Sequence, residues 1–208
     1  MHERDVYRQV AQLHASNIDQ GFLSSLGTPF LALLYEAIDA NESSVLLIAR
    51  HEGRVVGFVT GAEGMGPIYR QLLRRWASLA GALLPAVVSP HKLWKIAEIL
   101  LMGKKPQPLS DLPHAELLSI AVDPALRSQG HAGALYRGLV EHFRQRGVDR
   151  FRIVVGEPLA AAHHFYSRMG AEPVGRIEVH QGETSVLYVH RLARSGTPAH
   201  GIESHQFW

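Results

Sequence analysis

Hydrophobic residues near the start of the chain recur every three or four positions, the spacing of one face of a helix. They form two groups, Val6–Ile18 and Phe30–Ile38. Residues 21–29, between the groups, hold two glycines, two serines and a proline, which favour a break in regular structure. We therefore expect two helices joined by a loop.

Two runs rich in β-branched and apolar residues come next, Ser44–Arg50 and Arg54–Thr60. Only the three residues His51-Glu52-Gly53 separate them. Two such runs around a short glycine-containing turn predict a β-hairpin.

Segment 67–113 has a different pattern. Its apolar positions form two helical groups, one within Tyr69–Leu83 and one within Leu93–Leu101, with Pro85 and Pro90 between them. Charge is absent from residues 76–90, but this stretch is too short, and contains a proline too early, to span a membrane as a helix. We expect a helical insertion.

The second half of the chain alternates between strand and helix. Ala115–Val122 has the character of a strand, a glycine-containing turn follows, and Ala134–Arg146 has helical periodicity before a further strand at Phe151–Val155. This order predicts a parallel βαβ unit. The remaining expected elements are a helix at Leu159–Met169 and a strand pair at Arg176–His180 and Ser185–His190. We assign no structure to residues 195–208 and expect one α/β (α+β) domain over residues 1–194.

Composition narrows the classes of function. A chain of 208 residues with 46% hydrophobic and 19% charged residues suits one globular domain. The formal net charge of +2 gives no general attraction for nucleic acid. Absence of cysteine excludes disulfides, thiolate metal sites and a cysteine nucleophile. The polar N-terminus lacks the apolar stretch of a signal peptide, so we expect a cytoplasmic protein.

The turn after the predicted strand Ala115–Val122 carries the most chemistry. A strand that ends at Asp123-Pro124 and leads through a basic, glycine-containing turn into a helix leaves several backbone N–H groups unpaired at the positive end of the helix dipole. Such a turn predicts a pyrophosphate site. Its residues are Arg127, Ser128, Gln129, Gly130, His131, Ala132, Gly133 and Ala134. The alternative is an ordinary βα turn; the dinucleotide Gly-x-Gly-x-x-Gly and P-loop fingerprints are not met.

Three positions of this turn, Arg127, Gly130 and Ala132, fit the pattern Arg/Gln-x-x-Gly-x-Gly/Ala. Downstream, residues 165–171 read Phe-Tyr-Ser-Arg-Met-Gly-Ala, and upstream a predicted strand holds Gly57-Phe58-Val59. In this order the motifs resemble the GNAT superfamily of N-acetyltransferases, over most of residues 44–190 except 67–113. The resemblance implies a mixed central β-sheet flanked by helices, with acetyl-CoA as the acetyl donor and an amine as the acceptor.

The resemblance also implies roles for individual residues. Glu116 matches the glutamate that serves as general base in histone-acetylating members, and Tyr166 matches the tyrosine beside the CoA sulfur, a candidate acid. Backbone amides around Ala121 and Val122, with Ile120 beside them, are the expected cofactor and oxyanion contacts. The alternatives are a solvated charge at Glu116 and a core aromatic at Tyr166.

Two further features qualify this assignment. Strand periodicity predicts that Glu116, Leu118, Ile120 and Val122 share one face of the sheet. Many GNAT members place an asparagine before the Phe-Tyr pair to hold the pantetheine arm, whereas Leu159 stands near that position here.

The acceptor amine is expected to approach past the 21–29 loop. The predicted contacts are Phe22, Ser24, Ser25 and Tyr35. We expect the apolar residues of segment 67–113 to pack on the sheet, with a lid over the acceptor, a homodimer contact and a peripheral membrane contact as the alternatives. The basic residues of the membrane alternative are Arg70, Arg74, Arg75, Lys92 and Lys95, and its tryptophans are Trp76 and Trp94.

The acceptor itself is not specified by the sequence. The loop before the second helix loosely resembles that of bacterial members acting on amino sugars; small amines, protein N-termini and lysines remain open. The alternatives to acetyl transfer are a longer acyl donor and an inactive CoA-binding module. We expect no metal, because the adjacent His163 and His164 point apart on a helix and no His-Glu-x-x-His pattern occurs.

Overall fold

A computed structural model describes residues 3–18, 24–83, 112–180 and 183–192. The N-terminal helices are α1 (Glu3–Asn17) and α2 (Thr28–Asp39), and the expected hairpin is β1 (Ser44–His51) with β2 (Arg54–Ala62). The C-terminal half contains β3 (Glu116–Val122), α6 (His131–Gln145), β4 (Arg150–Gly156), α7 (Ala160–Arg168), β5 (Glu172–His180) and β6 (Glu183–Arg191). These predicted elements are therefore confirmed, with boundaries shifted by a few residues. The tail at 195–208 lies outside the described residues.

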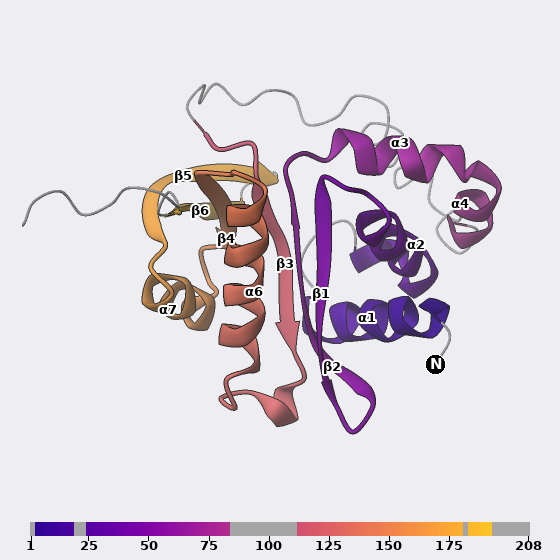
Figure 1. Ribbon diagram of the computed structural model, residues 1–208, viewed down its shortest axis with the longest axis horizontal. Helices are drawn as coiled ribbons and strands as arrows, with labels where there is room; N and C mark the ends of the chain where they lie inside the picture. Colours follow the sequence, from indigo (N-terminus) through magenta and orange to yellow (C-terminus); the bar gives the residue numbers. More distant parts are fainter. Residues whose placement is uncertain (1–2, 19–23, 84–111, 181–182, 193–208) are drawn as a thin grey trace, which may run out of the picture.

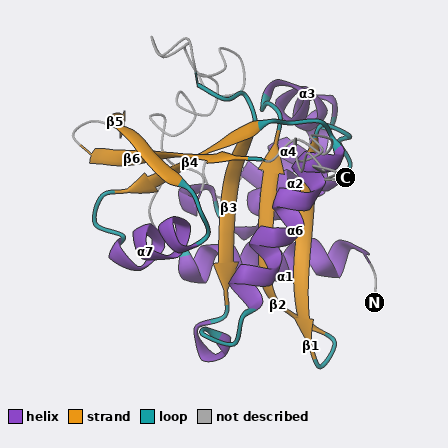
Figure 2. Cartoon of the chain, turned by 60° about the vertical axis from the view of Figure 1, so that its left-hand side comes forward, coloured by secondary structure: helices purple, strands orange, loops and turns teal. Residues whose placement is uncertain are grey.

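One mixed six-stranded sheet organises the chain, in the order β1-β2-β3-β4-β6-β5. Among the described strands, β3 and β4 form the parallel pair, joined through α6, and the other neighbours are antiparallel. This confirms the expected βαβ unit. Figure 2 shows β4, β5 and β6 lying crosswise to β1, β2 and β3. The sheet therefore changes direction at the junction of β3 and β4.

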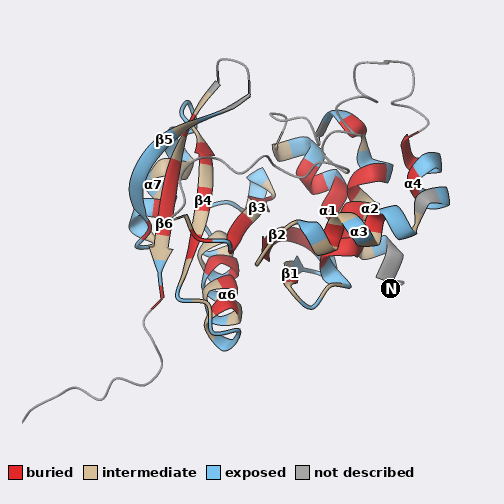
Figure 3. Ribbon diagram, turned by 90° about the horizontal axis from the view of Figure 1, so that it is seen from above, coloured by how far each residue is buried: buried red, intermediate tan, exposed pale blue. Residues whose placement is uncertain are grey.

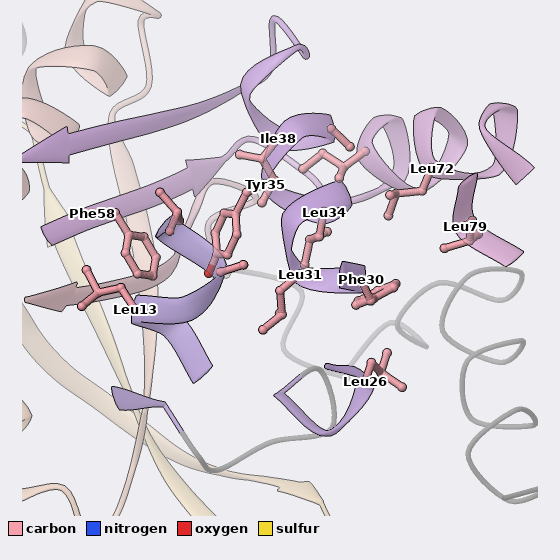
Figure 4. Packing of buried hydrophobic residues seen from close by; sticks show 14 of the residues in the cluster. Leu13, Leu26, Phe30, Leu31, Leu34, Tyr35, Ile38, Phe58, Leu72 and Leu79 are labelled. Atoms are coloured by element: carbon pink, nitrogen blue, oxygen red, sulfur yellow. The ribbon is translucent and has the colours of Figure 1, made fainter. Parts of the chain in front are cut away.

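Two hydrophobic clusters cover the sheet. The first joins α1 and α2 to β2, and it includes Tyr35 and Phe58, which lie beside each other in Figure 4. The second joins α6 and α7 to β4 and β6 around Tyr136 and Phe151. Figure 3 shows the same division, with α1 and α2 on one side and α6 and α7 on the other. Strand β3 contributes residues to both clusters.

The described part of segment 67–113 forms two short helices, α3 (Gly66–Arg74) and α4 (Trp76–Leu83). The single helix expected over Tyr69–Leu83 is therefore wrong, because the chain breaks at Arg75, whose backbone leaves helical geometry. Both helices pack against α2 through Leu72 and Leu79 (Figure 1). The insertion therefore packs on the fold in this part, but its main contacts are with a helix and not with the sheet as expected. Arg75, one of the basic residues of the membrane alternative, forms an ion pair with Glu36 of α2 at 2.7 Å.

The rest of the insertion falls outside the described residues. The second predicted helix, with Lys92, Trp94 and Lys95, lies within residues 84–111 and is not described. Within the described parts of the chain, no helix has the length and apolar character needed to cross a membrane.

Candidate active site

Strands β3 and β4 separate soon after they meet. Their parallel pairing is limited to Glu116 with Arg152 and Leu117 with Ile153, after which the facing edges diverge. In the neighbouring β2–β3 ladder, the N–H of Asp123 donates to the carbonyl of Val56 at 2.8 Å. Backbone N–H groups alternate in direction along a strand. Some of the N–H groups of the last residues of β3 therefore point into the opening between β3 and β4.

The same alternation decides which amides face this opening. Ala121 is two residues from Asp123 and shares its direction, so its N–H points into the β2 ladder. Ile120 and Val122 point the other way, towards the divergent edge. Of the three predicted cofactor contacts on β3, Ile120 and Val122 thus have suitable N–H groups, and the prediction for the Ala121 amide is corrected.

A β-bulge in β3 overturns the predicted alternation of side chains. Thr60 pairs with Ser119 and Gly61 pairs with Leu117, so Leu118 is the extra residue. Leu118 packs with the α1–α2 cluster, whereas Ile120 and Val122 pack with the α6–α7 cluster. Leu118 therefore shares a face with Glu116 as expected, and both line one pocket, but the expectation is wrong for Ile120 and Val122, because the bulge changes the side on which these later residues lie.

The turn between β3 and α6 has the geometry of an anion site. Gly130 precedes the helix with φ +86°, and Ser128 also has a positive φ of 63°. The first backbone hydrogen bond into the helix is Ala134 N–H to the carbonyl of Gly130. Among the described residues, no hydrogen bond uses the N–H groups of residues 128–133. Six successive unpaired N–H groups at the start of a 15-residue helix fit a pyrophosphate.

Arg127 is anchored at the edge of this turn. Its Nη2 donates to the side-chain oxygen of Asn17 at 2.7 Å, and its Nε donates to the carbonyl of Val122 at 3.4 Å. Arg127 thereby ties the end of α1 to the turn, while its charge remains beside the unpaired amides. Asn17, which the sequence analysis did not single out, is 110 positions away in the chain.

Glu116 stands where β3 and β4 meet. Its carboxylate Oε2 accepts hydrogen bonds from Nε and Nη2 of Arg152 at 3.0 and 2.7 Å. Glu116 is only 9% exposed, so the alternative of a fully solvated charge is excluded. Its surroundings are not the apolar face that periodicity predicted, because a guanidinium lies against it. Arg152 was missed by the sequence analysis, although a charged residue inside a predicted buried strand is a signal.

A pocket of about 190 Å³ opens beside this ion pair. Burial raises the pKa of Tyr69, and the nearby Glu116 carboxylate raises it further. Tyr69 belongs to α3, so the insertion supplies one wall of the pocket. The lining residues are Ala62, Gly64, Met65, Gly66, Tyr69, His114, Glu116, Leu118 and Arg152.

Tyr166 lies on α7 within a group of aromatic rings that includes Tyr136 and Tyr188. Tyr166 is 6% exposed, and burial raises the pKa of its hydroxyl above the ordinary value. In the described regions, none of the hydrogen bonds involves its hydroxyl, yet no fully buried side-chain oxygen or nitrogen there lacks a partner. The Tyr166 hydroxyl is therefore without a hydrogen-bond partner among the described residues, and it is deeply buried but not completely enclosed.

The predicted acceptor contacts have different outcomes. Phe22 lies outside the described residues, Ser24 and Ser25 form a short 3-10 turn (Ser24–Leu26), and Ser25 is exposed. Tyr35 is 1% exposed, so its expected role as an acceptor contact is corrected. Its hydroxyl hydrogen-bonds with Nδ1 of His14 and with Oγ of Ser119.

The described histidines are not arranged as a metal centre. Nδ1 of His163 hydrogen-bonds with the Tyr188 hydroxyl at 2.9 Å, and its other ring nitrogen lies 3.1 Å from the carbonyl of Gly156. In the regions that the structure describes, no three His, Asp or Glu side chains lie close enough together to hold a metal ion. The expectation of a metal-free site stays a prediction.

Solved structures of other proteins have the same fold as this chain. Solved structures of the same fold include the ribosomal-protein-S18-alanine N-acetyltransferase of Escherichia coli, with 13% identity, a TM-score of 0.55, and coverage of 100% of this chain and 96% of that one. An N-acetyltransferase from Staphylococcus aureus Mu50 has 12% identity, a TM-score of 0.60, and coverage of 92% and 96%. A GCN5-related N-acetyltransferase from Kribbella flavida has 13% identity, a TM-score of 0.59, and coverage of 92% and 95%.

Sequence comparison adds the family. None of the curated proteins matches the chain. The family described as "Acetyltransferase (GNAT) family" matches residues 13–171, which run from the last part of α1 through α2 and the splayed strands to the Tyr166 helix. This chain therefore belongs to the GNAT family and is an acyltransferase of the N-acetyltransferase type.

Proposed function

We propose that the protein transfers the acetyl group of acetyl-CoA to a primary amine by direct attack in a ternary complex. The observation that carries this proposal is the arrangement along β3. One end of the strand leads into the unpaired amides of residues 128–133, and the other end, at Glu116, lines a pocket. Donor and acceptor would thus meet from opposite ends of the same strand.

The chain supplies groups suited to each part of the transfer. The amides of residues 128–133 would hold the pyrophosphate, with Arg127 adding positive charge. Acetyl-CoA supplies an activated thioester. The N–H groups of Ile120 and Val122, which point towards the divergent edge of β3, would stabilise the negative charge that develops on its carbonyl oxygen.

Proton transfers complete the reaction. An aliphatic amine has a pKa of about 10 and must lose a proton before it can attack. We assign that proton to Glu116, directly or through water, and we assign protonation of the departing sulfur to Tyr166. A C–N bond forms, the C–S bond breaks, and the sulfur leaves as a thiol.

The acceptor assigned by this proposal is a small amine, of which an amino sugar is one candidate. The pocket of about 190 Å³ is smaller than the roughly 300–1,000 Å³ of pockets for drug-sized ligands. It favours a small acceptor over a folded protein.

A two-stage experiment tests the proposal. A melting-temperature titration with acetyl-CoA and with longer acyl-CoAs should give a saturable rise, largest for acetyl-CoA. Release of free thiol is then measured with a panel of amines for the parent and for Glu116→Gln, in which release should fall at least tenfold. A larger rise with longer chains would favour a longer acyl donor. Binding of acetyl-CoA without transfer to any amine would favour an inactive CoA-binding module.

A further inference from the structure

Arg152 presents an unused hydrogen-bonding edge to the pocket. Its guanidinium carries five N–H donors in a planar fork, and the Nε and Nη2 atoms are engaged by Glu116. Among the described residues, Nη1 has no hydrogen-bond partner, and no fully buried side-chain nitrogen or oxygen is left unpaired. Nη1 is therefore in contact with open space, and Arg152 is one of the residues that line the pocket.

A guanidinium held in this way is a receptor for a carboxylate. Glu116 fixes the plane of the Arg152 side chain through its Nε and Nη2, so little side-chain entropy is lost when a ligand binds. The outer edge of the same plane can form a second charge-assisted fork with a carboxylate. The unpaired edge thus points to an acceptor that carries an acid group.

The charge balance of the pocket narrows the ligand further. Glu116 and Arg152 together are neutral, so a simple carboxylate would meet repulsion from Glu116 as well as attraction to Arg152. A ligand that also carries an ammonium group would place opposite charges beside both residues.

We infer that the acceptor is a small free amino acid, whose carboxylate binds the outer edge of Arg152 and whose amino group lies near Glu116. This inference rests on the proposed acetyl transfer to an amine. The product is an N-acetylamino acid, formed as the thioester C–S bond breaks and the sulfur leaves as a thiol. Arg152 acts as the specificity-determining residue and Glu116 positions it.

Calorimetry on the protein saturated with CoA tests the inference without turnover. The probes are the twenty standard amino acids, each compared with its carboxamide, which keeps the amine and lacks the acid. At least one free acid should bind about 10- to 100-fold more tightly than its amide, the range expected for a charge-assisted hydrogen bond. Equal affinities within every pair, or no binding by any free acid, would overturn the inference.

Variants assign the preference to Arg152. Arg152→Lys keeps the charge but loses the planar fork, so the acid-over-amide ratio should fall to within about threefold. Arg150→Lys is the matched control, since Arg150 lies on the same strand outside the pocket, and its ratio should equal that of the parent. An unchanged ratio in Arg152→Lys would remove Arg152 from this role. If Arg152→Lys fails to fold, the acid and amide comparison on the parent protein decides alone.

The proposed function can fail separately from this inference. Acid-selective binding together with no thiol release from acetyl-CoA would leave the amino acid site standing and overturn acetyl transfer. Efficient acetylation of amines regardless of an acid group would support acetyl transfer and overturn the amino acid site.

Discussion

The hydroxyl oxygen of Tyr35 lies 2.5 Å from Nδ1 of His14, although the two residues come from different helices. The same hydroxyl lies 3.3 Å from Oγ of Ser119, which in turn lies 2.8 Å from Oγ1 of Thr60. A chain of buried and partly buried polar groups therefore runs from α1 through α2 to the bulged part of β3 and on to β2. It links the helical layer to the strand whose backbone faces the proposed donor site.

His14 should make stability depend on pH. Burial lowers the pKa of His14 from 6.5 to about 4. Between these two pH values the unfolded chain binds a proton at this histidine that the folded chain does not. The neutral, buried His14 therefore contributes to the free energy of unfolding above pH 6.5, and this contribution is lost as the pH falls towards 4. The full difference corresponds to about 3 kcal/mol. The measurement is the free energy of unfolding in urea at pH 7.5 and at pH 4.5. The decrease between the two pH values should be smaller in His14→Gln than in the parent, by about 2–3 kcal/mol.

An exposed histidine provides the control for that measurement. His51 lies at the exposed end of β1. His51→Gln should show the same decrease in the free energy of unfolding between pH 7.5 and pH 4.5 as the parent. An equal acid loss in the parent and in His14→Gln would show that His14 is not the residue responsible.

The hydroxyls of Ser119 and Thr60 should be energetically coupled. Thr60 is fully buried, and Ser119 is its side-chain partner among the described residues. Ser119→Ala should lower the free energy of unfolding by about 1–3 kcal/mol, because it leaves a buried hydroxyl unpaired. Thr60→Val should lower it less, since Ser119 keeps Tyr35 as a partner. The double variant should be destabilised by less than the sum, with a coupling of at least about 0.5 kcal/mol. A sum that is strictly additive in denaturant unfolding would contradict the coupling.

Local sequence patterns were sufficient for the βαβ unit and for the turn that follows β3. The turn depends on residues adjacent in the chain, and Gly130 at positive φ is readable from its identity. The ion pair of Glu116 with Arg152 joins residues 36 positions apart and depends on the register of two parallel strands. Residue spacing alone does not fix such a register.

The bulge at Leu118 was beyond sequence reasoning for a related reason. An extra residue in one strand is defined only by comparison with the partner strand, here β2 across Thr60 and Gly61. Strict alternation therefore gave the wrong face for Ile120 and Val122. Tyr35 was misplaced because an aromatic residue with a hydroxyl is equally suited to a ligand wall and to a buried polar chain, and only the positions of His14 and Ser119 decide between them.

Gly130 allows a test of the anion site that separates binding from stability. An added Cβ at Gly130 would meet no protein atom within 4 Å, but φ is +86°, so Gly130→Ala strains the backbone that aims the neighbouring N–H groups. Gly147 is a matched control with φ +72° and equally open surroundings, at the far end of α6. Each alanine variant should lose about 1–2 kcal/mol of stability. By calorimetry, Gly130→Ala alone should weaken acetyl-CoA binding about tenfold or more, and equal affinities in the two variants would argue against the turn as the donor site.

Tyr166 provides the sharpest test of chemistry, because it is buried while its hydroxyl has no hydrogen-bond partner among the described residues. Burial raises the pKa of Tyr166, so the hydroxyl keeps its proton at neutral pH, the state that a donor needs, although the same shift makes it a weaker acid than an exposed tyrosine. Tyr166→Phe should lower kcat about 100-fold or more, with the Kd for acetyl-CoA within about twofold of the parent. Tyr136→Phe is the control: this hydroxyl hydrogen-bonds with His190 at 3.1 Å, so its loss should lower stability and leave kcat near the parent value. If Tyr166→Phe turns over as fast as Tyr136→Phe in single-turnover measurements, the sulfur is protonated by another group, and Tyr166 belongs only to the aromatic core.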